Sequence, residues 1–220
     1  MSWKTNHGRA PGLDAKRPLI RRGVDLTISG FAASIFQSRW NTMSSIPPRS
    51  LSTDRLLLRP TCALDADRAL EIQSDWEVTR MLSMASFPPD GPQIKQWFAD
   101  HEREWLAGEA YRFAVNLESR MIGVVDVDAI VECEGSLGYW LDRAAWGHGY
   151  AFEAARAVTR FAFQDVGLRA LRAGHAHDNP TSGRVLTKLG FAPLDTVLLF
   201  SRPRGESVAQ CRYKLTSSIA

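Results

Sequence analysis

The feature that most constrains this chain is a glycine-containing turn between a predicted strand and a predicted helix. Residues 137–142 have a strand-like pattern, and residues 150–165 place small and apolar side chains on one helical face. The turn between them reads Trp146-Gly147-His148-Gly149-Tyr150-Ala151. The first amides of a helix have no intrahelical partner, and glycines let an anion approach them closely. The turn therefore predicts either a phosphate-binding site or a tight connection without a ligand.

Two familiar phosphate-binding folds do not fit this turn. It lacks the Gly-Lys-Ser/Thr ending of a nucleoside-triphosphate P-loop. It also lacks the third glycine, and the acidic residue about 20 positions later, that a dinucleotide-binding fold uses. If the turn binds phosphate, the ligand belongs to another class.

A second motif, HDNPTSGRVLTKLGF, covers residues 177–191, with Asn179 placed to cap a helix and Gly190 placed to end it. Together with LGYWLDRAAWGHGYAFEA at residues 137–154, it resembles the GCN5-related N-acetyltransferase (GNAT) superfamily. Within that superfamily it is most similar to the ribosomal-protein-alanine N-acetyltransferase-like (RimJ/RimL-type) branch. The matching residues are Gly138, Tyr139, Trp140, Trp146, Gly147, Gly149, Tyr150, Ala151, Glu153, Ala154, Asn179, Ser182, Arg184, Val185, Lys188, Leu189, Gly190 and Phe191.

The resemblance implies an acetyl-CoA-dependent N-acetyltransferase. The residues that it implies for binding acetyl-CoA are Trp140, Leu141, Trp146, Gly147, His148, Gly149, Tyr150, Ala151, Asn179, Ser182 and Arg184. The amides of the glycine turn would bind the pyrophosphate, and the strand near Trp140 would bind the pantetheine arm. His148 stands where Lys or Arg is common, which argues against a charge contact to phosphate there.

The predicted elements have an order that suits this family. Strands are predicted at residues 55–59, 111–117, 121–131, 135–142, 168–177, 191–200 and 208–215, and helices at 64–73, 91–107, 150–165 and 180–189. The three-strand meander should be antiparallel, and the strand–helix–strand unit should be parallel. We therefore expect a mixed α/β (α+β) GNAT fold with a largely antiparallel sheet of about six to seven strands and about four helices.

The charge distribution divides the chain. Residues 1–49 carry eight Lys and Arg against two Asp, a net +6, so the other 171 residues carry −3 of the total +3. We expect residues 1–50 to be a basic, disordered leader, residues 51–216 to be the N-acetyltransferase domain and residues 217–220 to be a tail. A transit peptide and an extension upstream of a start at Met43 are alternatives for the leader. The mildly acidic body argues against nucleic-acid binding.

The cysteine spacing and the lengths of the apolar runs argue against several classes of protein. The three cysteines, Cys62, Cys133 and Cys211, are widely spaced and form no CxxC pair, which argues against a disulfide framework and a zinc site. No apolar run approaches the length of a membrane span. We expect a cytoplasmic protein without a metal, a monomer or a homodimer, whose partners are acetyl-CoA and an amine acceptor.

Acetyl transfer from a thioester to an amine needs orientation, polarisation of the carbonyl, a group that stabilises the leaving thiolate and a neutral amine. Ser182 and Tyr139 are the predicted catalytic residues at the leaving group, Ser182 on the strength of the family match. No covalent enzyme intermediate is needed, and neither Cys133 nor Cys211 has a base beside it in the sequence.

The group that accepts the amine proton stays open. The candidates are Asp126 and Asp128, which share a strand face, then Glu134, His175 and His177. For each carboxylate, a solvated charge at a sheet edge is the competing interpretation. A non-catalytic acyl-CoA-binding module is the alternative for the whole domain, and it predicts binding without thiol release.

Overall fold

The computed structural model describes residues 46–217, so residues 1–45 of the predicted leader lie outside the described part of the chain. The strands are β1 (Leu51–Ser52), β2 (Leu56–Pro60), β3 (Tyr111–Leu117), β4 (Arg120–Val131), β5 (Glu134–Leu141), β6 (Ala170–Ala176), β7 (Ala192–Ser201) and β8 (Glu206–Thr216). The helices are α2 (Ala66–Gln73), α3 (Trp76–Thr79), α4 (Gly91–Leu106), α5 (Tyr150–Gln164) and α6 (Pro180–Lys188), with short 3-10 helices η1 (Ala63–Asp65) and η2 (Arg143–Ala145).

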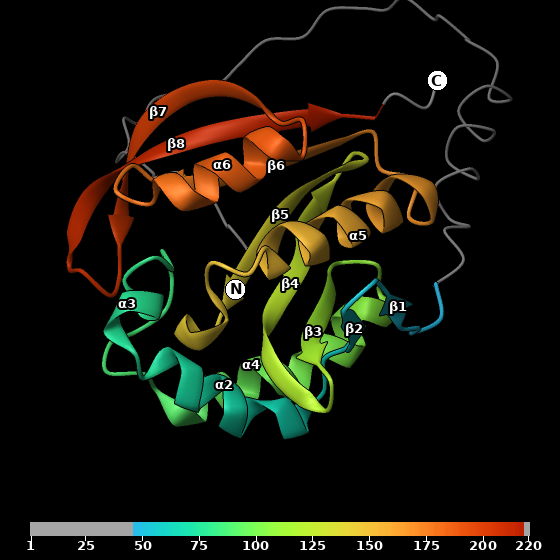
Figure 1. Cartoon of the computed structure of the whole chain (residues 1–220), viewed down its shortest axis with the longest axis horizontal. Helices are drawn as coiled ribbons and strands as arrows, with labels where there is room; N and C mark the ends of the chain where they lie inside the picture. The colour runs from blue at the N-terminus through green and yellow to red at the C-terminus, as the bar shows by residue number, and fades with distance from the viewer. Residues whose placement is uncertain (1–45, 218–220) are drawn as a thin grey trace, which may run out of the picture. The chain divides into compact units, whose positions relative to one another are not determined.

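All the strands of the described region form one sheet, in the order β1-β2-β3-β4-β5-β6-β8-β7 (Figure 1). Every neighbouring pair is antiparallel except β5 and β6, which are parallel. The predicted mixed fold is therefore confirmed. Within residues 46–217 the sheet has eight strands and there are five α-helices, one more of each than expected. The additions are β1, with two residues, and α3, with four, both too short to show a periodic pattern.

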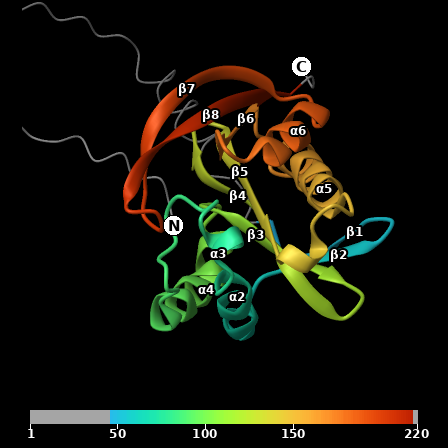
Figure 2. The ribbon, with the colours of Figure 1, turned by 60° about the vertical axis from the view of Figure 1, so that its left-hand side comes forward.

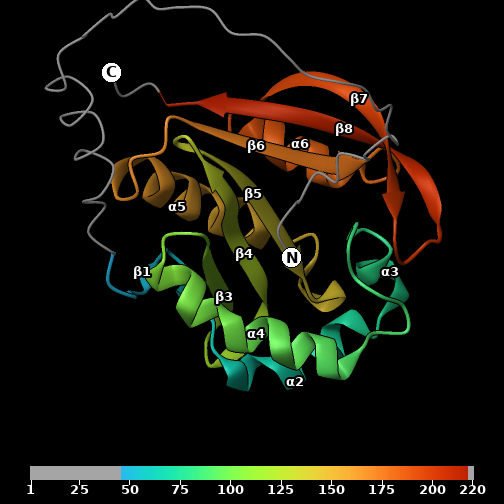
Figure 3. The ribbon, with the colours of Figure 1, turned by 180° about the vertical axis from the view of Figure 1, so that it is seen from behind.

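Helices cover both faces of the sheet (Figures 1, 2 and 3). The larger apolar cluster packs α5 and α6 against one face and includes Phe113, Val125, Leu137 and Phe161. The smaller cluster packs α2 and α4 against the other face, where Val124 and Trp140 contact them. Because successive strand residues point to opposite faces, Tyr139 stands on the α5 and α6 face. Asp126, Asp128 and Trp140 stand on the α2 and α4 face.

The sheet opens between β5 and β6. These strands pair only over Glu134–Ser136 and Ala170–Arg172, although each continues for several residues beyond the last pair. From Leu137 onward β5 keeps its partner β4 on one edge and, among residues 46–217, has no paired strand on the other. The unpaired edge ends at Leu141 and is followed by η2 and then by the glycine turn. The fold therefore connects an open strand edge to the N-terminus of α5 through a short segment.

The segment before β1 contacts the body. The indole of Trp105 donates a 2.8 Å hydrogen bond to the carbonyl of Ile46, and Arg49 forms a 2.5 Å ion pair with Asp165. These contacts place residues 46–49 against α4 and α5. No helix within the described residues has the length and apolar character needed to cross a membrane.

Candidate functional site

The glycine turn has the conformation that its sequence predicts. Gly147 and Gly149 have φ angles of 80° and 81°, which other residues adopt only at a cost. Gly149 is the N-cap of α5, and its carbonyl accepts the amide of Glu153 at 3.1 Å. A Cβ atom at Gly147 would meet nothing within 4 Å. The turn thus leaves open space at the N-terminus of a fifteen-residue helix, whose first amides lack intrahelical partners.

Arg55 lies against this turn, which the sequence did not predict. Its Nη1 donates to the carbonyl of His148 at 3.1 Å, and its Nε donates to Glu153 at 2.8 Å. The guanidinium lies 4.5 Å from the ring centroid of Tyr150. The side chain remains 47% exposed, so a cation faces solvent beside Gly149. No local pattern reveals this placement, because Arg55 precedes His148 by 93 positions in the chain.

Glu153 fixes the position of Arg55. Glu153 lies in the first turn of α5, and its side chain is only 8% exposed. Burial alone would raise the pKa of Glu153, yet hydrogen bonds from Thr53 and Arg55 hold this pKa below its usual value. The Thr53 hydroxyl donates to the carboxylate at 2.6 Å. Glu153 is therefore an ionised anchor that joins the start of α5 to the segment before β2.

The open edge of β5 presents alternate backbone groups. The amide of Asp142 donates to the carbonyl of Ile122 on β4 at 2.7 Å. Because successive amides of a strand point in opposite directions, the amides of Leu141 and Tyr139 point away from β4, toward the open side. Trp140 points its amide toward β4. The Trp146 indole donates to the Leu141 carbonyl at 3.0 Å and thereby ties the turn to the strand.

Tyr139 and Ser182 meet on the α5 and α6 face. Their hydroxyl oxygens are 2.8 Å apart, and the Tyr139 hydroxyl also lies 3.2 Å from the Ser182 carbonyl. Burial raises the pKa of Tyr139 to about 12, against the opposing effect of the Ser182 hydrogen bond. Asn179 caps α6, since its side chain accepts the Ser182 amide at 3.2 Å. The two predicted catalytic residues are therefore brought together from segments 43 residues apart.

The other residues predicted to bind acetyl-CoA lie in the glycine turn, in α5 and in α6. His148 stacks on Tyr150 with ring centroids 5.6 Å apart. Arg184 donates to the Thr181 hydroxyl at 2.9 Å on the exposed side of α6. Ala151 lies in the first turn of α5 and packs against the larger apolar cluster. In the described part of the chain, no group of three or more His, Cys, Asp and Glu side chains is arranged to hold a metal ion.

The candidate proton acceptors separate into two groups. Asp126 and Asp128 lie on the α2 and α4 face beside the buried Arg112. Glu134 instead accepts hydrogen bonds from Lys214 and Arg172, which hold the pKa of Glu134 below its usual value.

Both candidate histidines have contacts of their own. His175 is buried, with Nδ1 2.8 Å from the carbonyl of Ala176 and Nε2 3.3 Å from the Tyr213 hydroxyl. His177 lies 3.7 Å from the sulfur of Cys211. Neither histidine lies beside Asp126 or Asp128 in these contacts.

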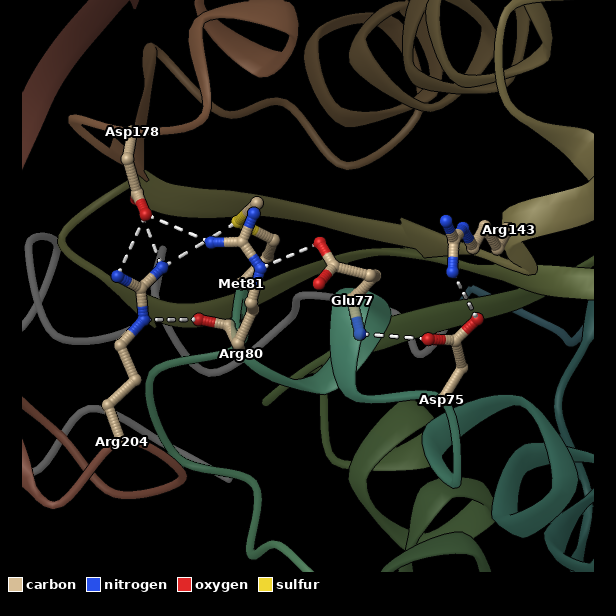
Figure 4. Close-up of polar contacts among 7 residues, drawn as sticks. All are labelled: Asp75, Glu77, Arg80, Met81, Arg143, Asp178 and Arg204. Carbon is tan, nitrogen blue, oxygen red and sulfur yellow. Dashed lines mark hydrogen bonds and ion pairs between the residues drawn. The ribbon is translucent and has the colours of Figure 1, made fainter.

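An arginine cluster joins three segments near the start of α6 (Figure 4). Arg204, in the turn between β7 and β8, binds both carboxylate oxygens of Asp178 at 2.9 and 3.0 Å. Arg80, which ends α3, binds Asp178 at 2.9 Å, and its carbonyl accepts the Arg204 Nε at 2.8 Å. Because Asp178 directly precedes Asn179, the cluster fixes the N-terminus of α6 relative to α3.

Comparisons with known proteins agree with this geometry. A family model described as an acetyltransferase (GNAT) domain matches residues 55–192. The uncharacterized N-acetyltransferase p20 of Bacillus licheniformis is 28% identical over 163 residues, a match covering 72% of this chain and 91% of the relative. The ribosomal protein uS5-alanine N-acetyltransferase of Escherichia coli (strain K12) is 28% identical over 162 residues, covering 67% of this chain and 80% of the relative.

The solved structures include RimL, a ribosomal L7/L12 α-N-protein acetyltransferase in complex with coenzyme A. It superposes with a TM-score of 0.71 at 16% identity, over 78% of this chain and all of that one. At this identity the likeness shows the fold alone. The family model is stronger evidence, since it spans more than half of the chain, including β5, the glycine turn and α6. The protein belongs to the GNAT family of acetyltransferases.

Proposed function

We propose that the protein transfers the acetyl group of acetyl-CoA to a primary amine by direct attack, without a covalent enzyme intermediate. The observation that carries this proposal is the continuity of three features along β5. An unpaired strand edge runs from Leu137 to Leu141, the glycine turn lies at one end, and the Tyr139–Ser182 hydroxyl pair lies beside it. A long donor with phosphates at one end and a thioester at the other suits this arrangement.

Acetyl-CoA would lie along this path on the α5 and α6 face. The pyrophosphate would accept the amides of Gly147 to Ala151, where the macrodipole favours an anion. The outward amides of Tyr139 and Leu141 would bind the pantetheine arm and polarise the thioester carbonyl. Asn179 would contact the arm from α6. The coenzyme A complex of RimL, which has the same fold, supports this assignment.

Tyr139 and Ser182 would stabilise the leaving thiolate. Because burial raises the pKa of Tyr139 to about 12, its hydroxyl stays protonated at neutral pH. Full transfer of that proton to a thiolate is unfavourable, since an ordinary thiol has a pKa of about 8.5. The Tyr139 hydroxyl would therefore donate a hydrogen bond to the sulfur, and the thiolate would take its proton from solvent.

The acceptor would be a protein α-amine or a small-molecule amine. At pH 7, deprotonating an α-amine with a pKa of about 8 costs about 1.4 kcal/mol, against about 4.6 kcal/mol for a lysine side chain. The uS5-alanine N-acetyltransferase relative, by its name, acts on alanine, which supports an α-amine. The test is thiol release from acetyl-CoA against alanine-initiated peptides, free amino acids, polyamines and aminoglycosides. Binding of acetyl-CoA without release for any amine would favour a non-catalytic module.

We further propose that Arg55 contacts a phosphate of acetyl-CoA and compensates for the histidine at position 148. Arg55→Gln is then expected to raise the Kd of acetyl-CoA about tenfold, because a charge-assisted hydrogen bond contributes about 1.5–3 kcal/mol and this side chain is half exposed. Calorimetry measures the Kd, and added salt should weaken the wild type more than the variant. The kcat/KM for S-acetylpantetheine, which has no phosphate, should stay unchanged. An equal loss with both donors contradicts a phosphate contact.

We also propose that the acetyltransferase domain folds without residues 1–42 of the basic leader. Deleting residues 1–42 is expected to shift the Tm by less than about 2 °C, because the contacts of Ile46 and Arg49 with the body are retained. Differential scanning calorimetry of the full and shortened chains measures this. A much larger fall in Tm would mean that residues 1–42 stabilise the domain.

A further inference from the structure

Two carboxylates lie across β5 from the hydroxyl pair. Asp126 and Asp128 of β4 are paired in register with Gly138 and Ser136 of β5. A Cβ atom at Gly138 would come within 2.4 Å of the Asp126 carboxylate, so this carboxylate extends over the backbone of β5. Ser136 is the last residue of β5 that pairs with β6. The carboxylates therefore flank the point where the edge of β5 opens.

The described surroundings of these carboxylates hold fewer positive than negative charges. Arg112 is 2% exposed and faces three carboxylates, those of Glu104, Asp126 and Asp128. Its Nη1 contacts Glu104, whereas its Nε lies 3.7 Å from Asp126, too far for a hydrogen bond. That Nε has no hydrogen-bond partner among the described residues. One cation among three carboxylates leaves the site short of positive charge, and an ammonium ion would supply that charge.

The neighbouring side chains of α4 do not supply the missing charge. His101 is buried, and burial and the nearby Arg112 lower its pKa to about 2, so its imidazole is neutral. Its Nε2 and the Nε1 of Trp97 are also buried without hydrogen-bond partners in the described region. The Arg112 guanidinium lies 5.4 Å from the ring centroid of Trp97. The unpaired polar atoms of Trp97 and His101 therefore belong to rings packed near Arg112, the cation that the carboxylates share.

We propose that Asp126 and Asp128 hold the acceptor as an ammonium ion and remove its proton before it attacks the thioester. This assignment rests on the proposed acetyl transfer. With the donor on the α5 and α6 face, the amine would approach from the α2 and α4 face, opposite the Tyr139–Ser182 pair. The thioester carbonyl would then have the proton acceptors on one side and the donors for the leaving sulfur on the other.

Every proton released in the proposed step is accounted for. The ammonium gives one proton to the carboxylate pair, and the freed lone pair forms the C–N bond at the carbonyl carbon. Collapse of the intermediate breaks the C–S bond and releases the second N–H proton, while the thiolate takes up one proton. Each turnover of an ammonium substrate therefore releases one proton to solvent, together with the N-acetyl product and the free thiol.

The acidity of the pair suits this role. Burial raises the pKa of both carboxyls, and Asp126 raises that of Asp128 further, against the opposing effect of Arg112. The pKa of Asp128 reaches about 7. A base is most effective when its pKa lies near the working pH, and an α-amine has a pKa of about 8. Because the two groups are coupled, the titration belongs to the pair.

The test compares Asp126→Asn and Asp128→Asn with the wild type, using acetyl-CoA and an alanine-initiated peptide between pH 5.5 and 9.5. If the wild type acetylates only another amine of the panel, that amine replaces the peptide. We expect the wild-type kcat/KM to rise through an apparent pKa near 7. At least one variant should lose about 100-fold at pH 7, and recover at pH 9.5, where the amine is already neutral. The Kd of acetyl-CoA should not change. The matched control is Asp67→Asn, because Asp67 is an 80% exposed aspartate of α2.

Retention of wild-type kcat/KM at pH 7 by both variants would overturn the assignment. If the variants fail to fold, a 13C NMR titration of aspartate carboxyls in the wild type replaces them. One carboxyl titrating near pH 7 supports the assignment, and titration of every aspartate below pH 5 overturns it. The NMR result does not depend on turnover. Failure of the proposed function itself is instead recognised by absence of thiol release from every amine in the panel.

Discussion

Gly149→Val is expected to raise the Kd of acetyl-CoA by about 100-fold. Gly149 has a φ of 81°, in the region where an L-residue is strained and a β-branched residue is most strained. A Cβ there would also lie 3.6 Å from the Arg55 guanidinium. The start of α5 must then shift, and the amides that would receive the pyrophosphate lose their alignment. Loss of one or two charge-assisted hydrogen bonds, at about 1.5–3 kcal/mol each, would account for a rise in Kd of about 100-fold.

A glycine beyond the other end of α5 provides the matched control. Gly167 lies just beyond the C-terminal end of the same helix, has a φ of 78°, and a Cβ there would meet nothing within 4 Å. Gly167→Val therefore imposes similar backbone strain away from the turn, and should lower the Tm without changing the Kd. Calorimetric titration of both variants separates strain from ligand contact. Unchanged acetyl-CoA affinity in Gly149→Val would contradict a phosphate-binding role for the turn.

Tyr139→Phe is expected to lower kcat about 100-fold while leaving the Kd of acetyl-CoA within about twofold. Its hydroxyl and that of Ser182, 2.8 Å apart, are the donors assigned to the leaving sulfur. Loss of one positioned donor at developing negative charge typically costs about 100- to 1,000-fold in kcat. Because the pKa of Tyr139 is about 12, this residue should add no limb to the pH–rate profile between pH 6 and 10.

Two further variants check this role of Tyr139. Ser182→Ala should also lower kcat more than affinity, and the double variant should lose less than the product of the two single effects, because the hydroxyls act as one unit. Tyr213→Phe serves as the control, since the hydroxyl of Tyr213, on β8, contacts His175 of β6 and not the pair. Steady-state kinetics measure all four chains. If Tyr139→Phe keeps the wild-type kcat, then Ser182 or solvent, and not Tyr139, stabilises the thiolate.

The sequence predicted the parts of the fold that depend on local pattern and on chain order. The meander, the cap at Asn179 and the beginning of α5 at Tyr150 all lie where the spacing of apolar and capping residues indicated. The glycine turn was recognisable because its chemistry is local: two glycines directly precede an amphipathic helix. Ser182 was predicted at the leaving group from the family resemblance and Tyr139 was predicted beside it, but their contact was not, since no local signal joins residues so far apart in the chain.

What the sequence did not predict depends on contacts between distant segments. Arg55 and Glu153 contact each other across 98 positions, so no local pattern shows that the Glu153 carboxylate is buried beside a cation. The choice among the candidate proton acceptors required knowing that Arg112 lies beside Asp126, whereas Lys214 neutralises Glu134. Burial and pairing, which set the pKa of each carboxyl, are properties of the folded chain.

The measurement that tests the central claim most directly follows the acetyl group itself. The wild type is incubated with acetyl-CoA labelled with 13C in the acetyl group and with the amine panel. Free thiol, N-acetyl product and intact protein mass are then quantified together. Direct transfer predicts equal amounts of thiol and labelled N-acetyl product, with no acetyl-enzyme at any time during turnover. Thiol release without an N-acetyl product, or a labelled acetyl-enzyme that forms and decays at the rate of turnover, would contradict it.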